Sequence, residues 1–181
     1  IYCLFRSFTV RYIFINQILD SFETEEYIFI FMEYICGDLL SFIRKRSKLS
    51  EKICQMLFKQ IIIGLDYIHK KGIVHRDIKL DIILIDLNNT IKICDFGVSR
   101  KVTKGALMFE RCGTPAYIAP EIFLKEGYEG YQCDIWSAGV TLYYMLSGTQ
   151  PFKGANINEL EANILSGEFE KIEDISFEAH N

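Results

Sequence analysis

The chain has 181 residues, half of them hydrophobic, which is enough for one domain with a packed core. Its formal net charge of -4 gives no general reason to expect a nucleic acid as partner, because phosphate backbones are held by clustered Lys and Arg on a basic face. No apolar run approaches the roughly 20 residues that a membrane-spanning helix needs, so we expect no membrane partner either.

The cysteines show no spacing that is typical of a metal site. They are Cys3, Cys36, Cys54, Cys94, Cys112 and Cys133. No two of them form a C-x-x-C pair, and with only three histidines in the chain no zinc pattern appears. We interpret them as reduced thiols, several of them buried as small hydrophobic side chains. This usage favours a cytoplasmic protein, with the nucleus as the alternative.

The first nineteen residues contain Arg6 and Arg11 but no acid and no glycine. Such a segment superficially suits mitochondrial targeting. We favour the alternative, a core helix and strand that enter a domain already begun. Because the chain opens on Ile1 and not on Met, we expect a fragment or an incomplete gene model.

The next elements are a strand and a long helix. Residues 27–35 are β-branched and aromatic, which predicts a strand, interrupted by Gly37 and Asp38. The basic run at residues 44–48 is interpreted as a solvated helix end. An amphipathic helix is predicted between a cap at Ser50 and Gly72. Its apolar face comprises Ile53, Met56, Leu57, Ile61, Leu65 and Ile68.

Two short apolar runs at residues 82–86 and 90–94, separated by Asn88 and Asn89, predict a hairpin. The hairpin leads into the tripeptide Asp-Phe-Gly at 95–97. A polar segment follows as far as Pro120, and loops of that length are usually functional. Beyond it we predict a buried helix over 135–146, apolar nearly all round, and an amphipathic helix over 157–165.

The loop after the long helix and the end of the hairpin carry groups suited to phosphoryl transfer. That reaction needs oxygen ligands for a hard cation, one positioned carboxylate to accept a proton, and a cation near the moving phosphoryl group. Asp77 is the candidate proton acceptor and Lys79 the candidate cation. Asp95, returned by the hairpin, offers two oxygens to Mg²⁺.

Four motifs in this order resemble those of the eukaryotic protein kinases, over residues 15–179. They are HRDIK at 75–79, DFG at 95–97, CGTPAYIAPE at 112–121 and CDIWSAGVTLYYMLSGTQPFKG at 133–154. Lys79, with Gly113 and Thr114 before Pro115, matches the serine/threonine type. The runs MLSGTQPF and DSFETEEY are most similar to the calcium/calmodulin-dependent and calcium-dependent kinase group.

The resemblance implies an α+β, two-lobe fold that binds ATP and Mg²⁺ and phosphorylates Ser or Thr of a protein. Residues 1–35 would be the remnant of the small lobe and the hinge, and residues 36–181 a large lobe without its last helices. A calcium-sensor domain or calmodulin would act from outside this chain.

The resemblance also assigns the site residues. The catalytic set is Asp77, Lys79 and Thr114, and the nucleotide and metal set is Met32, Glu33, Ile35, Asp38, Leu84 and Asp95. Met32 would be the gatekeeper and Glu33 and Ile35 the hinge; ordinary strand core is the other interpretation of Met32 and Ile35. Asp38 and Asp81 would attract basic residues upstream of the phosphorylated position. A helix N-terminal cap explains Asp38 equally well.

Two further roles follow from the same resemblance. Asp134 matches the acid that fixes the catalytic loop's backbone. Arg76 marks kinases that recognise a phosphate on the activation segment, and Glu110 stands at the matching position. We hypothesise that Glu110 pairs with Arg76 in place of a phosphate; a solvated surface glutamate is the alternative.

Three departures from the kinase pattern bear on activity. Ile82 stands where the family has an asparagine that binds a second Mg²⁺. No glycine precedes Gly37 and no lysine precedes Lys45, so the phosphate-covering loop and its lysine are not in this chain. The lysine's acidic partner is missing too, because no acid precedes Asp20.

Loss of the lysine and of the asparagine ligand would cost roughly 5 to 8 kcal/mol of transition-state stabilisation. The sequence therefore predicts a serine/threonine kinase domain whose 181 residues alone are inactive or nearly so. The alternatives are a pseudokinase that only binds partners and a truncated product without a stable fold.

Overall fold

A computed structural model describes residues 12–103, 105–124, 126–173, 175–176 and 179. The strands are β1 (Ile18–Glu23), β2 (Ile28–Met32), β3 (Gly37–Asp38), β4 (Ile73–Val74), β5 (Ile83–Ile85), β6 (Ile91–Ile93), β7 (Arg100–Lys101), β8 (Leu107–Met108) and β9 (Tyr128–Glu129). The helices are α2 (Leu39–Arg44), α3 (Glu51–Lys70), α4 (Gly130–Ser147) and α5 (Ile157–Ser166), with short 3₁₀ helices η1 (Leu80–Ile82), η2 (Pro115–Tyr117) and η3 (Pro120–Ile122).

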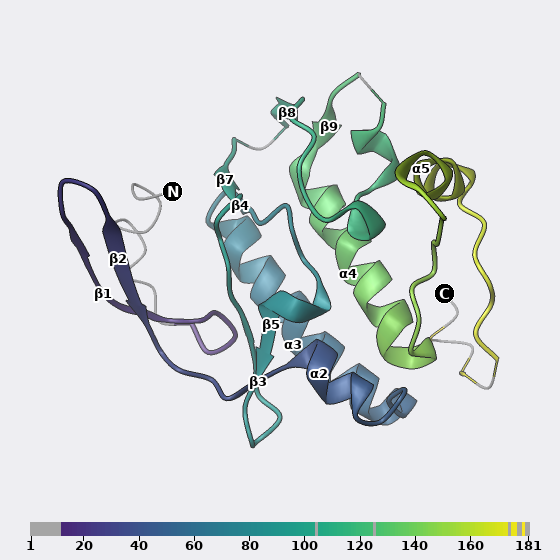
Figure 1. Cartoon of the computed structure of the whole chain (residues 1–181), viewed down its shortest axis with the longest axis horizontal. Helices are drawn as coiled ribbons and strands as arrows, with labels where there is room; N and C mark the ends of the chain where they lie inside the picture. Colours follow the sequence, from purple (N-terminus) through teal and green to yellow (C-terminus); the bar gives the residue numbers. More distant parts are fainter. Residues whose placement is uncertain (1–11, 104, 125, 174, 177–178, 180–181) are drawn as a thin grey trace.

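The molecule divides into a β-hairpin and a mainly helical body (Figure 1). Strands β1 and β2 pair antiparallel and extend away from the rest, whereas α3 and α4 lie side by side at the centre of the body. The predicted α+β class is confirmed. None of the helices in the described part of the chain combines the length and hydrophobicity that a bilayer span requires.

Helix α3 supplies one side of the main core. Its buried positions recur every three or four residues and are Cys54, Leu57, Ile61, Gly64, Leu65 and Ile68. The helix begins after Ser50 and ends before Gly72, which has a φ of 74°, so the predicted limits are confirmed. Two details differ: the Ser50 side chain makes no capping hydrogen bond, and Met56 is 43% exposed. Cys54 takes the core position instead. The buried side of the helix runs through Cys54, Leu57 and Ile61, and Met56 lies about 100° around the helix axis from Leu57.

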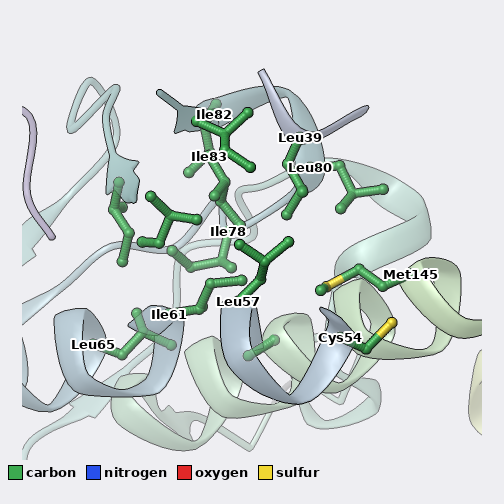
Figure 2. Packing of buried hydrophobic residues seen from close by; sticks show 14 of the residues in the cluster. Leu39, Cys54, Leu57, Ile61, Leu65, Ile78, Leu80, Ile82, Ile83 and Met145 are labelled. Atoms are coloured by element: carbon green, nitrogen blue, oxygen red, sulfur yellow. The ribbon is translucent and has the colours of Figure 1, made fainter. Parts of the chain in front are cut away.

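The predicted hairpin at 82–94 is confirmed as β5 and β6, with Ile83 opposite Ile93. A side chain shapes its turn: one oxygen of Asp86 accepts hydrogen bonds from the backbone N–H groups of Asn88 and Thr90, both at 2.8 Å. Asn89 takes a φ of 58°, a conformation that asparagine tolerates better than most residues. The hairpin's isoleucines pack onto α3 (Figure 2).

The segment before β1 docks onto the body. Ile15 forms a parallel bridge with Ile93 of β6, and the Ile93 carbonyl accepts the N–H of Asn16 at 2.9 Å. The rings of Tyr12 and Tyr67 stack 3.9 Å apart. Gly64 of α3 leaves room for both partners, since a Cβ there would lie 3.4 Å from Phe14 Cβ and 2.9 Å from Ile93 Cδ1. These contacts fix where the β1–β2 hairpin leaves the body.

Several sequence expectations need correction. Only Ile28–Met32 of the predicted strand 27–35 is strand, because residues 33–35 leave it to reach the body. Helix α4 is mostly buried as expected, but Ile135 is 51% exposed, since it lies with Gln132 and Gly139 on a narrow strip of the helix that faces solvent. The amphipathic helix near the end is confirmed as α5. The N-terminal expectation mostly concerns residues 1–11, which lie outside the described ranges.

Replacing Ile61 by alanine should lower the free energy of unfolding by about 2 to 5 kcal/mol, because Ile61 is fully buried between α3 and the β5–β6 hairpin. Met56→Ala, on the exposed side of the same helix, should change it by about 0.5 kcal/mol or less. Urea titration followed by circular dichroism measures both. Equal effects would contradict the assigned core, and a non-cooperative wild-type transition would favour the interpretation as an unstable product.

Candidate active site

A buried carboxylate in α4 holds the backbone of the loop that follows β4. Asp134 is almost inaccessible to solvent; its two oxygens accept the N–H groups of His75 and Arg76, each at 2.8 Å. The His69 ring donates a third hydrogen bond of 2.8 Å from α3. These bonds hold the backbone of Arg76 at a φ of 71°, a strained conformation for any residue other than glycine. The assignment of Asp134 to the loop's backbone is thereby supported.

His75 connects this loop to the strand that leads to Asp95. The side chain is fully buried, and burial keeps the pKa of the imidazole below its ordinary value, so the ring is neutral. Its Nε2 lies 3.0 Å from the carbonyl oxygen of Cys94, to which it donates. The ring also packs against Phe96 at 4.8 Å between centroids. The loop and the segment at 94–97 are therefore positioned together.

Three predicted catalytic residues form one hydrogen-bonded group. Lys79 Nζ lies 2.8 Å from both Asp77 Oδ2 and Thr114 Oγ1. The other oxygen of Asp77 accepts the Thr114 hydroxyl at 2.7 Å and its backbone N–H at 2.8 Å. Each side chain is partly accessible. The group thus presents a carboxylate and an ammonium to solvent in a fixed relative position.

Gly113 allows the segment that carries Thr114, the end of the activation segment by the kinase resemblance, to approach the loop of Arg76 and Asp77. A Cβ at this position would lie 2.7 Å from the carbonyl oxygen of Arg76, and the residue has a φ of 110°. Both conditions exclude any residue with a side chain unless the backbone moves. Because Thr114 follows directly, its contact with Asp77 depends on the glycine.

Asp95 lies at the end of the β5–β6 hairpin and is exposed. It adopts a φ of 57°, and its Oδ1 accepts the N–H of Gly97 at 3.2 Å. Mg²⁺ in nucleotide sites is commonly held by one or two carboxylates together with phosphates and water. Asp95 fits that role, whereas within the described ranges no cluster of three His, Cys, Asp or Glu side chains could hold a metal alone.

Ile82 belongs to the hydrophobic core. It is 5% exposed and lies in the same cluster as Leu39 and Ile83 (Figure 2). The neighbouring Asp81 is exposed, whereas Ile82 is buried, so the two side chains point in different directions. The local backbone is a 3₁₀ turn, η1. Neighbours in such a turn are about 120° apart, which still separates their side chains.

The residues predicted for the hinge behave differently from one another. Met32 is 49% exposed, so its alternative interpretation as strand core is wrong, and Ile35 is half-buried. Glu33 Oε1 accepts a hydrogen bond from the N–H of Gln17 and forms an ion pair with Lys92 Nζ, each at 2.7 Å. Sequence reasoning missed Lys92, because nothing local marks a partner 59 positions away.

The remaining nucleotide and substrate residues lie near β3 and β5. Asp38 caps α2, since its Oδ1 accepts the N–H of Ser41 at 2.7 Å. The capping interpretation is therefore confirmed. Leu84 is a half-buried residue of β5, paired with both Asp38 and Lys92 in the small sheet.

Glu110 lies between two arginines. One carboxylate oxygen is 3.7 Å from Arg76 Nη1, and the other forms a hydrogen-bonded ion pair with Arg100 of β7. The Arg100 hydrogen bond is the main reason why the pKa of Glu110 lies below its ordinary value. Tyr128 of β9 also donates to the Glu110 carbonyl at 2.6 Å. The pairing expected with Arg76 is present, and Arg100 is a second partner that the sequence did not reveal.

Comparison with known proteins agrees with this geometry. A family model described as "Protein kinase domain" matches residues 7–181. The chain belongs to the protein kinase family. It is 40% identical over 159 residues to both CBL-interacting protein kinase 15 and CBL-interacting protein kinase 14 of Oryza sativa subsp. japonica, covering 86% of this chain in each case. It is 38% identical over 164 residues to CBL-interacting serine/threonine-protein kinase 5 of Arabidopsis thaliana, covering 89% of this chain. The matches cover 36% or 37% of the length of these relatives.

In this kinase domain, Glu110→Ala should expose the activation segment, because two arginines would lose their shared carboxylate. We expect faster chymotryptic cleavage after Leu107 and Phe109 at neutral pH, measured by mass spectrometry. Glu168→Ala, which removes an exposed carboxylate after α5, serves as the control. If the Glu110 variant is cleaved no faster than the wild type, Glu110 is a solvated surface residue and the pairing does not order the segment.

Burial raises the pKa of the Cys94 thiol to about 11, so little thiolate exists at pH 7.5. Iodoacetamide should therefore label Cys94 much more slowly than the exposed Cys36. The Cys94 rate should rise about tenfold per pH unit as the pH increases toward 11, since thiolate is the reacting form. Peptide mapping after timed quenching measures both rates, and equal labelling at pH 7.5 would contradict the burial of Cys94.

Proposed function

We propose that the protein to which this chain belongs is a serine/threonine kinase that transfers the γ-phosphate of ATP to a hydroxyl of a protein substrate. The observation that supports this most is the group formed by Asp77, Lys79 and Thr114, joined through His75 to the segment that carries Asp95. Residues 1–35 would contribute the small-lobe and hinge part, and residues 36–181 the large lobe.

In this mechanism Asp77 accepts the proton of the attacking hydroxyl. Its Oδ1 is held by Thr114 and its Oδ2 by Lys79, so the carboxylate cannot turn away from the substrate. The Lys79 ammonium offsets negative charge that develops on the transferred group. Asp95 would hold the Mg²⁺ that enters with ATP, and this ion would neutralise negative charge on the phosphates. Met32, Glu33, Ile35 and Leu84 would contact the nucleotide.

Recognition of the substrate would depend more on Asp81 than on Asp38. Asp81 is exposed on η1, four residues after Asp77, where it can attract a basic residue of a bound peptide. The Asp38 carboxylate already accepts a hydrogen bond at the start of α2. One oxygen remains for a substrate, so Asp38 would contribute less.

The activation segment would be ordered without phosphorylation. Glu110 supplies a carboxylate that pairs with Arg76 and Arg100. The Arg100 hydrogen bond lowers the pKa of this carboxyl, so Glu110 stays ionised to a lower pH than an ordinary glutamate. By the sign of that shift, the contribution is complete above the ordinary carboxyl pKa and is lost as the pH falls through the lowered one.

A calcium sensor is the proposed regulatory partner. The three relatives are named for interaction with CBL, and the sequence resembles the calcium/calmodulin-dependent kinase group. Because the chain spans about 37% of those relatives, such a partner would bind outside these 181 residues.

A pseudokinase that binds partners without catalysis is the second candidate. It is favoured by Ile82, whose side chain has no lone pair and is buried in the core, so it leaves Asp95 as the one expected metal ligand. These 181 residues alone would be inactive or nearly so in either case, because they lack the phosphate-covering loop and its lysine.

The decisive experiment measures ATP turnover by the longer protein. If Asp95 alone supports weak catalysis, Ile82→Asn should raise the rate by about 10² to 10³, the usual value of one preorganised polar contact. Ile82→Val is the matched control, and Asp77→Asn should abolish turnover. Thermal unfolding of each variant separates catalysis from stability, because Ile82→Asn buries a polar group.

The outcomes distinguish the candidates. Equal rates for the wild type and Ile82→Asn would show that Ile82 does not limit catalysis. No turnover by either folded protein would favour the pseudokinase and refute the enzymatic proposal.

A further inference from the structure

The β1–β2 hairpin joins the helical body through the segment before β1 and the segment after β2, and these segments meet (Figure 1). Glu33, which follows β2, donates its N–H to the carbonyl oxygen of Gln17, which precedes β1, at 2.9 Å. In return, Glu33 Oε1 accepts the N–H of Gln17 at 2.7 Å. The two segments are therefore tied to each other by one backbone and one side-chain hydrogen bond.

Strand β6 of the body is the third member of this junction. The N–H of Ile93 donates to the Phe14 carbonyl, and the Ile93 carbonyl accepts the N–H of Asn16, each at 2.9 Å. Lys92 precedes Ile93, and its Nζ lies 2.7 Å from Glu33 Oε1. Neighbouring residues of a strand point to opposite sides, so Ile93 enters the core while Lys92 reaches Glu33. One carboxylate oxygen thus connects both segments to the body.

The Glu33–Lys92 ion pair holds distant segments together. It joins residues 59 positions apart, and the exposed fractions of its side chains are 24% for Glu33 and 16% for Lys92. The pair of Lys70 and Asp66 differs in both respects, since it spans one turn of α3 and its side chains are 74% and 55% exposed. Partial removal from water strengthens an ion pair, whereas exposed pairs contribute little. The Glu33–Lys92 pair is therefore suited to fix the relative position of two parts of the molecule.

Lys92 also lies beside the expected nucleotide site. In the small sheet it is opposite Leu84, and residues directly opposite each other on neighbouring strands project to the same face. Leu84 and the segment that begins at Glu33 would both contact the nucleotide under the function proposed above. The ion pair therefore sets the separation between two parts of that site.

We propose that Lys92 is a positioning residue, which holds the segment that begins at Glu33 against β6 and thereby fixes the expected contacts to the adenine part of a nucleotide. This inference rests on the nucleotide binding proposed above. A site that is already held in its binding conformation loses less conformational entropy when the ligand binds, so its affinity is higher. Lys92 would act through Glu33 and would not itself touch the nucleotide.

The first test measures the affinity of the longer protein for N-methylanthraniloyl ADP by fluorescence, and for adenosine by competition. Lys92→Met should weaken both about three- to tenfold, between the values for an exposed ion pair and a buried charged hydrogen bond. Adenosine should lose as much affinity as the ADP derivative, because the position of the adenine contacts is what changes. Lys92→Arg keeps the charge and should retain most of the affinity. In turnover assays, KM for ATP should rise by the same factor while kcat stays unchanged.

A change at Glu33 separates positioning from direct attraction of phosphate. Glu33→Gln keeps an acceptor for the Gln17 N–H but removes the ion pair, so it should weaken binding as Lys92→Met does. The double variant should bind no more weakly than either single variant, because both remove the same interaction. Lys70→Met, the matched control, removes a lysine from the pair with Asp66 and should bind like the wild type. Thermal unfolding of every variant verifies that it is folded.

Hydrogen exchange without nucleotide tests the junction separately from the proposed function. Peptides that contain the amides of Gln17 and Glu33 should exchange faster in Lys92→Met than in the wild type, and Lys70→Met should leave them unchanged. If the wild type binds no nucleotide but this difference is present, the proposed nucleotide site is refuted while the role of Lys92 in holding the junction is supported.

Three results would overturn the proposal. The first is unchanged exchange at both amides in the folded Lys92→Met variant. The second is a loss of affinity for the ADP derivative but not for adenosine, or tighter binding by Glu33→Gln, which would make Lys92 a direct phosphate contact. The third is tighter binding by Lys92→Met, which would mean that the ion pair restrains the site instead of preparing it.

Discussion

The hydrogen bonds of Asp134 are the constraint on which the site depends. One buried carboxylate accepts the N–H groups of His75 and Arg76 and the ring of His69. A buried carboxylate without such donors would be costly, and the strained backbone of Arg76 would have no reason to persist. Because the loop is fixed at this point, Asp77 faces Thr114 and Arg76 faces Glu110. The contacts of the proposed catalytic and regulatory residues thus share one anchor in α4.

The site combines a hydrogen-bonded group of polar side chains with one apolar residue, Ile82, at a position where the proposed mechanism would use a ligand. Asp77, Lys79 and Thr114 hold one another in place, and Asp95 remains exposed at the end of its hairpin. Ile82 has joined the core instead, which stabilises the body at a position where a polar ligand would be expected. The same turn therefore contributes to stability through Ile82 and to the exposed acidic surface through Asp81.

Local patterns predicted much of the fold. The limits of α3 follow from its apolar period and flanking residues, and the β5–β6 turn follows from Asn88 and Asn89. The kinase resemblance predicted two long-range contacts, of Glu110 with Arg76 and of Asp134 with the loop backbone. Other features were not predictable, because Lys92 for Glu33, Arg100 for Glu110 and the solvent exposure of Met32 depend on which distant segments meet. At Asp38 the sequence could not decide between two roles, because a helix cap and a contact to a basic substrate both need an acidic residue.

The docking of residues 14–16 onto β6 has a consequence for the order of folding. Ile15 and Ile93 are 78 positions apart (93 - 15), so their contact closes a much longer loop than the β5–β6 turn does. Contacts of long sequence separation generally form after local ones. Helix α3 and the β5–β6 hairpin can assemble first and provide the surface, including the space above Gly64, that the earlier segment requires. During synthesis, therefore, the β1–β2 hairpin leaves the ribosome early but acquires its fixed position only after β6 has emerged.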